Sequence, residues 1–251
     1  MFVKNSLGLA LAGLLLAGSA AILLGHAALA AKEPQKKTME KTPITHSNPA
    51  SGRQMFKDYC AACHGAAGKG GAANALADPV FLAIADDAVI LRVTANGTPG
   101  TPMPAFAESA GGMLTDEQID VLVRGIRSWQ KPAGFNGANP PPYAAEGPGD
   151  SRRGSIAFAT YCSSCHGPEG RGDKKGSSIV NGSFLALVSD QYLRTTVIVG
   201  RPELGAPDWR GDVPGHPMSA QEVSDIVAWL AAQRTQFPGQ PYPASALNSE
   251  K

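Results

Sequence analysis

Cys60-Ala61-Ala62-Cys63-His64 is the stretch that decides the fold, and its pattern returns as Cys162-Ser163-Ser164-Cys165-His166. Two cysteines three positions apart lie on one face of a helical turn, so both sulfurs can bond the edges of one porphyrin. The adjoining histidine is then delivered to the iron. The two copies use all four cysteines of the chain. The sequence therefore predicts two covalently bound haem c groups, one in each half.

Two other chemistries also use paired cysteines. Four thiolates and two histidines could hold zinc, but a zinc site does not require a histidine directly after the second cysteine of each pair. A thioredoxin-like dithiol lies beside a strand and a helix in a βαβ unit, and no stretch around Cys60 or Cys162 has the pattern of a parallel strand. Both alternatives are weaker than haem attachment.

Together with Tyr59, Tyr161 and the pair Met103-Pro104, the two motifs resemble a tandem of class I c-type cytochrome domains. The resemblance covers roughly residues 48–129 and 152–234. It implies an all-α fold, in which a small helical domain surrounds each haem and carries one electron at a time. It also implies the residues that attach the haems and bind the iron, namely Cys60, Cys63 and His64 in the first half and Cys162, Cys165 and His166 in the second.

The composition agrees with short helices joined by long turns. The chain has 251 residues, 43% of them hydrophobic, with 29 glycines and 20 prolines. The predicted layout is a signal peptide or membrane anchor (1–30), a polar tether (31–47), a first cytochrome c domain (48–130), a Pro/Gly-rich linker (131–151), a second cytochrome c domain (152–236) and a tail (237–251).

The N-terminal segment predicts export. Lys4 precedes an uncharged apolar run from Leu7 to Leu24, and Ala28-Leu29-Ala30 offers small residues at which a signal peptidase could cut. The run is longer than the roughly 7–15 residues of a signal-peptide core and close to the roughly 17–25 that span a bilayer. A cleaved leader and an uncleaved anchor in the cytoplasmic membrane both stay open. Either one places the haem domains in the periplasm or facing it.

The charge balance argues against one class of partner. The chain carries 22 basic and 21 acidic side chains, a formal net charge of +1. Nucleic-acid-binding domains gather an excess of positive charge, so we expect no nucleic-acid partner.

An internal repeat follows from setting the two motifs in register at an offset of 102. Gly52, Phe56 and Tyr59 then match Gly154, Phe158 and Tyr161, and each set predicts one stripe of an amphipathic helix whose glycine lets a second helix approach closely. Leu91-Arg92 matches Leu193-Arg194 at the same offset, and we expect both arginines to be exposed.

Helix boundaries can be predicted in both halves from their capping residues. Acidic or hydroxyl residues open helices over 86–96 and 189–199, and a glycine follows each. Capping boxes at Thr115/Gln118 and Ser219/Glu222 open a final helix in each half. In the family this last helix crosses the first one.

The sixth iron ligand decides whether a haem transfers electrons or binds small molecules. In the first half, Met103 stands between Pro102 and Pro104 on a stiff loop and is the predicted ligand, with Met113 as the fallback. In the second half, counting six residues from Gly200 gives Ala206, where counting six from Gly97 gives Met103. Met218 is the predicted ligand there, and His216 or an open, water-bound iron are the alternatives.

These features predict a dihaem electron carrier, or the cytochrome subunit of a respiratory or photosynthetic complex. The expected partners are redox proteins such as a quinol-oxidising complex, a terminal oxidase or a reaction centre. We expect no catalytic activity. The alternative is a dihaem enzyme, of the peroxidase or sulfur-compound oxidase type, in which Ala206 leaves the second iron open.

Overall fold

The structure is a computed structural model that describes residues 49–132, 134–135, 137–211 and 213–235. The predicted leader or anchor, the tether and the tail lie outside the described residues. Within them, every regular element is a helix, which confirms the all-α fold. None of these helices combines the length and the apolar character needed to cross a membrane.

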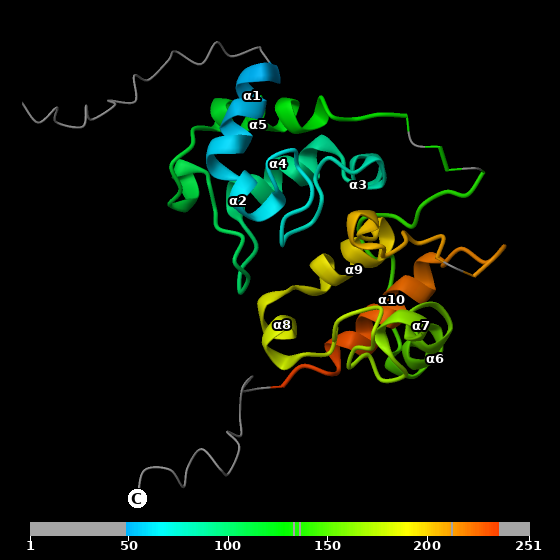
Figure 1. Cartoon of the computed structure of the whole chain (residues 1–251). Helices are drawn as coiled ribbons and strands as arrows, with labels where there is room; N and C mark the ends of the chain where they lie inside the picture. The colour runs from blue at the N-terminus through cyan, green and yellow to red at the C-terminus, as the bar shows by residue number, and fades with distance from the viewer. Residues whose placement is uncertain (1–48, 133, 136, 212, 236–251) are drawn as a thin grey trace, which may run out of the picture. The chain divides into compact units, whose positions relative to one another are not determined.

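Each half contains the same succession of helices (Figure 1). In the first half they are α1 (Pro49–Tyr59), α2 (Ala61–His64), α3 (Pro79–Ile84), α4 (Asp87–Asn96), the 3-10 helix η1 (Glu108–Ala110) and α5 (Asp116–Arg127). In the second half they are α6 (Ser151–Tyr161), α7 (Ser163–His166), α8 (Gly182–Leu187), α9 (Asp190–Val199), the 3-10 helix η2 (Pro202–Leu204) and α10 (Ala220–Ala231). The described residues between Arg127 and Ser151 form no helix or strand.

The first and last helices of each half cross in contact, at the predicted glycines. A Cβ on Gly52 of α1 would overlap the carbonyl oxygen of Val121 in α5, and a Cβ on Gly154 of α6 would overlap that of Asp225 in α10. A larger residue at either position would push the helices apart. Because α1 and α6 lead directly into the two cysteine motifs, these crossings position the motifs.

The predicted helix caps are present in both halves. Asp86 and Ser189 accept hydrogen bonds from the first turns of α4 and α9, and both capping boxes are complete. The apolar stripes of the last helices are buried: Ile119, Leu122, Val123 and Ile126 in α5, and Val223, Ile226, Val227 and Leu230 in α10. The sequence thus determines these helices by capping at one end and by burial along one face.

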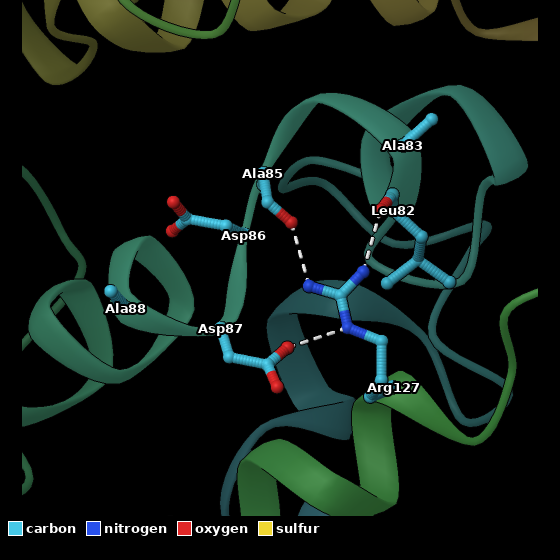
Figure 2. Close-up of a pocket in the computed structure, with 7 residues that line it drawn as sticks. All are labelled: Leu82, Ala83, Ala85, Asp86, Asp87, Ala88 and Arg127. Atoms are coloured by element: carbon cyan, nitrogen blue, oxygen red, sulfur yellow. Dashed lines mark hydrogen bonds and ion pairs between the residues drawn. The ribbon is translucent and has the colours of Figure 1, made fainter.

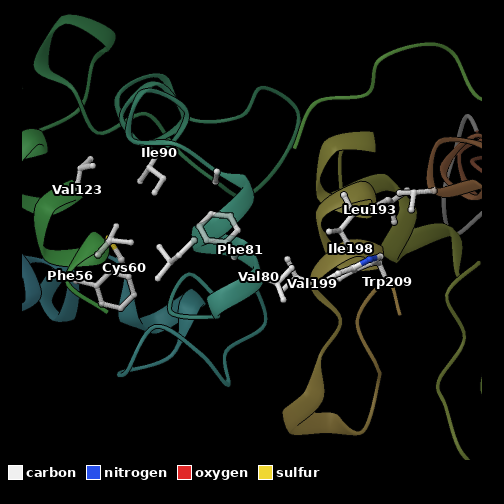
Figure 3. Close-up of a cluster of buried hydrophobic side chains, with 14 of the residues drawn as sticks. Phe56, Cys60, Val80, Phe81, Ile90, Val123, Leu193, Ile198, Val199 and Trp209 are labelled. Atoms are coloured by element: carbon white, nitrogen blue, oxygen red, sulfur yellow. The ribbon is translucent and has the colours of Figure 1, made fainter. Parts of the chain in front are cut away.

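Aromatic rings pack beneath both crossings. Phe56 meets the edge of Trp129 with ring centroids 4.9 Å apart, and Phe158 stacks on Trp229 at 4.2 Å. Figure 3 shows Phe56 and Cys60 among the core side chains of the first half, and Ile198 and Trp209 among those of the second. The first cysteine of the first motif is therefore part of a core.

One expectation is wrong: Arg194 is buried, whereas Arg92 is exposed. The loop after the second motif is one residue longer, so α9 is related to α4 by an offset of 103, as Gly97 and Gly200 at their ends show. Leu91, the counterpart at this offset, is 39% exposed, so the contact with the linker, and not the helix register, accounts for the burial of Arg194. Its guanidinium donates to Pro142 O at 2.9 Å and to Ser224 Oγ at 3.0 Å, and so fastens the linker to α10.

A second repeated feature is an arginine that joins the last helix to the turn between two earlier ones. Arg127 donates to Leu82 O (2.5 Å), Ala85 O (2.7 Å) and the Asp87 carboxylate (2.7 Å), as Figure 2 shows. Arg234 makes the corresponding bonds to Leu185 O, Val188 O and Asp190. Arg234 lies three residues beyond the end of α10, so an alignment of the last helices does not reveal the pair.

We predict that Arg127→Ala lowers the free energy of unfolding by about 2 kcal/mol, because it leaves two carbonyls and a carboxylate without their partner. Arg234→Ala should do the same in the second half. Guanidinium unfolding of the haem-loaded protein, followed by circular dichroism, measures both. The exposed Arg92 is the control, and its alanine variant should lose less than about 0.5 kcal/mol. Equal losses in all three variants would contradict the role of these arginines.

A buried carboxylate ties α6 to α10. Asp225 is 3% exposed and accepts from Arg153 Nε at 2.7 Å, from Asp150 N at 2.7 Å and from Gln221 Nε2 at 2.8 Å. Hydrogen bonds from Arg153, more than any other cause, lower the pKa of Asp225 to about 2. Because the folded-state pKa lies below the unfolded value, this carboxylate stabilises the fold above about pH 4 and loses that contribution as the pH falls toward 2.

We therefore predict that Asp225→Asn removes an acid-sensitive contribution of about 2 kcal/mol. Unfolding free energies measured at several pH values between 2 and 6 should fall less steeply in this variant than in the native protein. Replacing the exposed Asp120 by Asn should leave the slope unchanged. Parallel curves for Asp225→Asn and the native protein would refute the assignment.

Candidate haem-binding sites

Each cysteine motif begins where a crossing helix ends. Cys60 follows α1, and α2 carries Cys63 and His64; Cys162 follows α6, and α7 carries the corresponding pair. Cys60 is buried and Cys63 exposed, and none of the four thiols forms a disulfide. Each half thus presents two free sulfurs and one imidazole on a single turn, the set that covalent haem attachment requires.

The environment of the first cysteine in each pair suits an uncharged sulfur. Burial, with a smaller effect of the neighbouring cysteine, raises the pKa of the Cys60 thiol to about 11 and that of Cys162 to about 12. A zinc site needs thiolates, whereas a thioether to a porphyrin is neutral. Among the described residues, no group of three or more His, Cys, Asp or Glu side chains is arranged to hold a metal ion by itself.

Both histidines are oriented by a backbone carbonyl. His64 Nδ1 lies 2.8 Å from Asn74 O, and His166 Nδ1 lies 2.7 Å from Ser177 O. Nδ1 is therefore the donor, and Nε2 is left with its lone pair for a metal. Burial lowers the pKa of His64, which favours the neutral imidazole that binds iron. The acceptors are main-chain oxygens, so no residue type in the sequence could have identified them.

The second half also holds a buried polar atom that needs a partner. Within the described residues, Trp209 Nε1 is the buried side-chain nitrogen or oxygen that has none. A buried N–H without an acceptor is costly, and a haem propionate is an acceptor of the right kind. Together with the donor sets, this atom indicates that the residues fit a haem. No pattern of residues in the sequence indicated this unpaired N–H.

The loop that carries Met103 is held by hydrogen bonds within the loop. Met103 O accepts from Thr98 N at 3.0 Å, and Met103 N donates to Thr101 Oγ1 at 3.2 Å. Gly97, with φ of 65°, closes against it so tightly that a Cβ would lie 2.6 Å from Ala105 N. The half-buried Met103 is thus kept on a rigid loop, whereas the fallback Met113 is 64% exposed.

In the second half, Met218 is not part of the loop that corresponds to that of Met103. That loop carries Ala206, whose carbonyl oxygen accepts from Arg201 N at 3.0 Å. Met218 lies immediately before α10 and is buried, and His216 is exposed in the turn before it. The assignment of Met218 to the iron stays a prediction.

Hydrogen bonds from the second half reach the loop that orients His64. The described residues of both halves belong to one compact unit. The bonds run from Tyr192 Oη to Ala72 O (3.2 Å), from Thr196 Oγ1 to Asn74 Oδ1 (3.0 Å) and from Arg201 Nη2 to Gly71 O (2.6 Å). Asn74 therefore joins His64, through its backbone, to α9, through its side chain.

Comparison with known proteins gives a family match in both halves. A family model described as cytochrome C oxidase, cbb3-type, subunit III, matches residues 47–124 and again 149–230. Together the two matches cover more than half of the chain.

Individual proteins show the same likeness. The cbb3-type cytochrome c oxidase subunit CcoP of Azospirillum sp. is 34% identical over 134 residues, which are 49% of this chain and 40% of that protein. The chain thus spans about two fifths of the length of this relative. The cytochrome bc1 complex cytochrome c subunit of Mycobacterium bovis is 24% identical over 242 residues, 90% of this chain and 78% of that protein.

Among solved structures, a reducing HAO-like protein complex of Kuenenia stuttgartiensis matches with a TM-score of 0.45 and 19% identity. The match covers 76% of this chain and 98% of that one.

Proposed function

The chain belongs, in both of its halves, to the family described as cytochrome C oxidase, cbb3-type, subunit III, and from this premise we propose that it carries electrons one at a time as the cytochrome component of a respiratory complex. The membership confirms two tandem cytochrome c domains, and with them covalently bound haem c as the cofactor. The haem supplies the redox chemistry. The chain would attach it and orient the proximal ligand.

The observation that carries the proposal is the duplicated set of two sulfurs and one oriented imidazole. Cys60 and Cys63 hold the first haem and Cys162 and Cys165 the second, with His64 and His166 as the proximal ligands. Met103 is the sixth ligand of the first iron, on a loop whose backbone bonds keep it in place. A fixed His/Met pair raises the potential and suits reversible electron transfer.

The proposed partners are other redox proteins of the respiratory chain. The relatives are named as subunits of a cbb3-type oxidase and of the bc1 complex, which supports a quinol-oxidising complex or a terminal oxidase as the assembly. The apolar run from Leu7 to Leu24 supports export. We place the haem domains in the periplasm, either free or anchored in the cytoplasmic membrane, and assign them no catalytic activity of their own.

Covalent attachment can be tested by mass. Protein matured in an exporting host with haem-ligation machinery should carry two haems that survive acidified-solvent extraction. The double substitution Cys60→Ala/Cys63→Ala should lose one haem, and the matching change at Cys162 and Cys165 the other. Intact mass spectrometry counts them, with Ser164→Ala as the control that keeps both. Extraction of all pigment from the native protein would refute the proposal.

Electron transfer can be tested by potentiometry. The native protein should show two reversible one-electron transitions. Met103→Ala should lower the potential of one of them by on the order of 100 mV, because the sulfur that stabilises ferrous iron is lost. Met113→Ala, which removes an exposed methionine beyond the same loop, should change neither transition. The absence of reversible transitions in haem-loaded protein, or equal effects of the two substitutions, would contradict the assignment.

A further inference from the structure

We propose that the second haem iron has no protein ligand on its sixth side, and that this half binds a small iron ligand there. The proposal rests on the haem attachment proposed above. It assigns to the second half a function that the first half lacks, because Met103 occupies the corresponding place in the first. Backbone hydrogen bonds show which residues of the two halves are equivalent.

The loops that follow α4 and α9 share a backbone hydrogen bond and a close approach of a glycine to a proline, in the same register. Thr98 N donates to Met103 O, and Arg201 N donates to Ala206 O, both at 3.0 Å. A Cβ on Gly97 would lie 2.5 Å from the carbonyl carbon of Pro104, and a Cβ on Gly200 would lie 2.5 Å from that of Pro207. The residue before that proline is a methionine in one half and an alanine in the other. Ala206 is therefore the structural counterpart of Met103.

Met218 is the counterpart of a core leucine. Leu114 N donates to Phe106 O, and Met218 N donates to Trp209 O, both at 2.8 Å. Leu114 and Met218 each come directly before the N-cap of the last helix, and they are 1% and 7% exposed. Methionine and leucine have similar volumes and replace one another in cores. Its position thus explains the burial of Met218 without a bond to iron.

His216, the other candidate donor, lies in the turn before Met218. Its side chain is exposed, and its backbone N–H donates to Val213 O at 3.2 Å. Gly215, with φ of 75°, precedes it and shapes the turn. Neither donor is on the loop of Ala206. A methyl group cannot bind iron, so that position remains for a molecule from solution.

The ligand class follows from iron chemistry. Ferrous haem with an open position binds neutral diatomic molecules such as carbon monoxide, and ferric haem binds small anions such as cyanide. Ala206 leaves free only the space that a methionine side chain fills in the first half, so we expect only a small ligand to bind there. Carbon monoxide and cyanide are the probes for the experiment.

The experiment titrates the full haem-loaded protein with carbon monoxide after reduction and with cyanide after oxidation. One equivalent of each should bind per chain, with half of the Soret absorption responding. Ala206→Met should abolish binding and double the weak sulfur-to-iron charge-transfer band of the oxidised protein. Met103→Ala should raise the carbon monoxide stoichiometry to two. Two low-spin haems inert to both probes in the native protein would overturn the proposal.

Met218→Leu and His216→Ala separate the remaining alternatives. Both should bind the same single equivalent as the native protein, and thermal unfolding should show that Met218→Leu still folds. If the native protein binds nothing and either variant binds one equivalent, that residue is the ligand and the proposal is wrong. Haem content and potentiometry on the same samples test the proposed electron carrier separately. A protein with two haems and reversible transitions that binds neither probe would contradict only the open second iron.

Discussion

The close crossing of the first and last helices in each half is the constraint on which the other features depend. It is possible because Gly52 and Gly154 have no side chain to separate the backbones. The crossing fixes the end of α1 and of α6, and the first cysteine of each motif follows there directly. Two sulfurs and an imidazole on one turn can meet a single porphyrin only if that turn has a fixed direction. The packing of these two helices thus positions the residues that attach the cofactor.

Much of this could be predicted from the sequence, because the signals are local. Caps, apolar stripes and the two motifs depend on residues within a few positions of one another. The predicted ranges 86–96 and 189–199 match α4 and α9 together with their N-cap residues, Asp86 and Ser189. What could not be predicted depends on how residues of the second half align with those of the first. The longer loop after the second motif adds one residue, and the next loops add another, so a single offset of 102 does not pair equivalent residues of the later helices. The acceptors of His64 and His166 are main-chain oxygens and leave no mark in the sequence.

The candidate iron ligands show the same limit of prediction from the sequence. Proximity in sequence made Met218 the natural substitute for a missing methionine, since it is the methionine nearest to Ala206. The backbone bonds show instead which residues occupy equivalent places, and they pair Met218 with Leu114. The interaction between halves is likewise visible only in space, where Thr196 meets Asn74 although 122 positions separate them. Through Asn74, the packing of α9 acts on the residue that orients His64.

A difference in iron coordination between the halves needs no difference in scaffold. The loop of Met103 is held by a backbone bond from Thr98, by the hydroxyl of Thr101 and by the tight approach of Gly97, none of which involves the Met103 side chain. The loop of Ala206 keeps the equivalent backbone bond and the equivalent glycine, so its shape does not depend on a bond between its side chain and a metal. A methionine can therefore be exchanged for alanine there without unfolding the loop. On the same loop backbone, a methionine side chain suits the iron to electron transfer, and an alanine leaves it free to bind a small ligand.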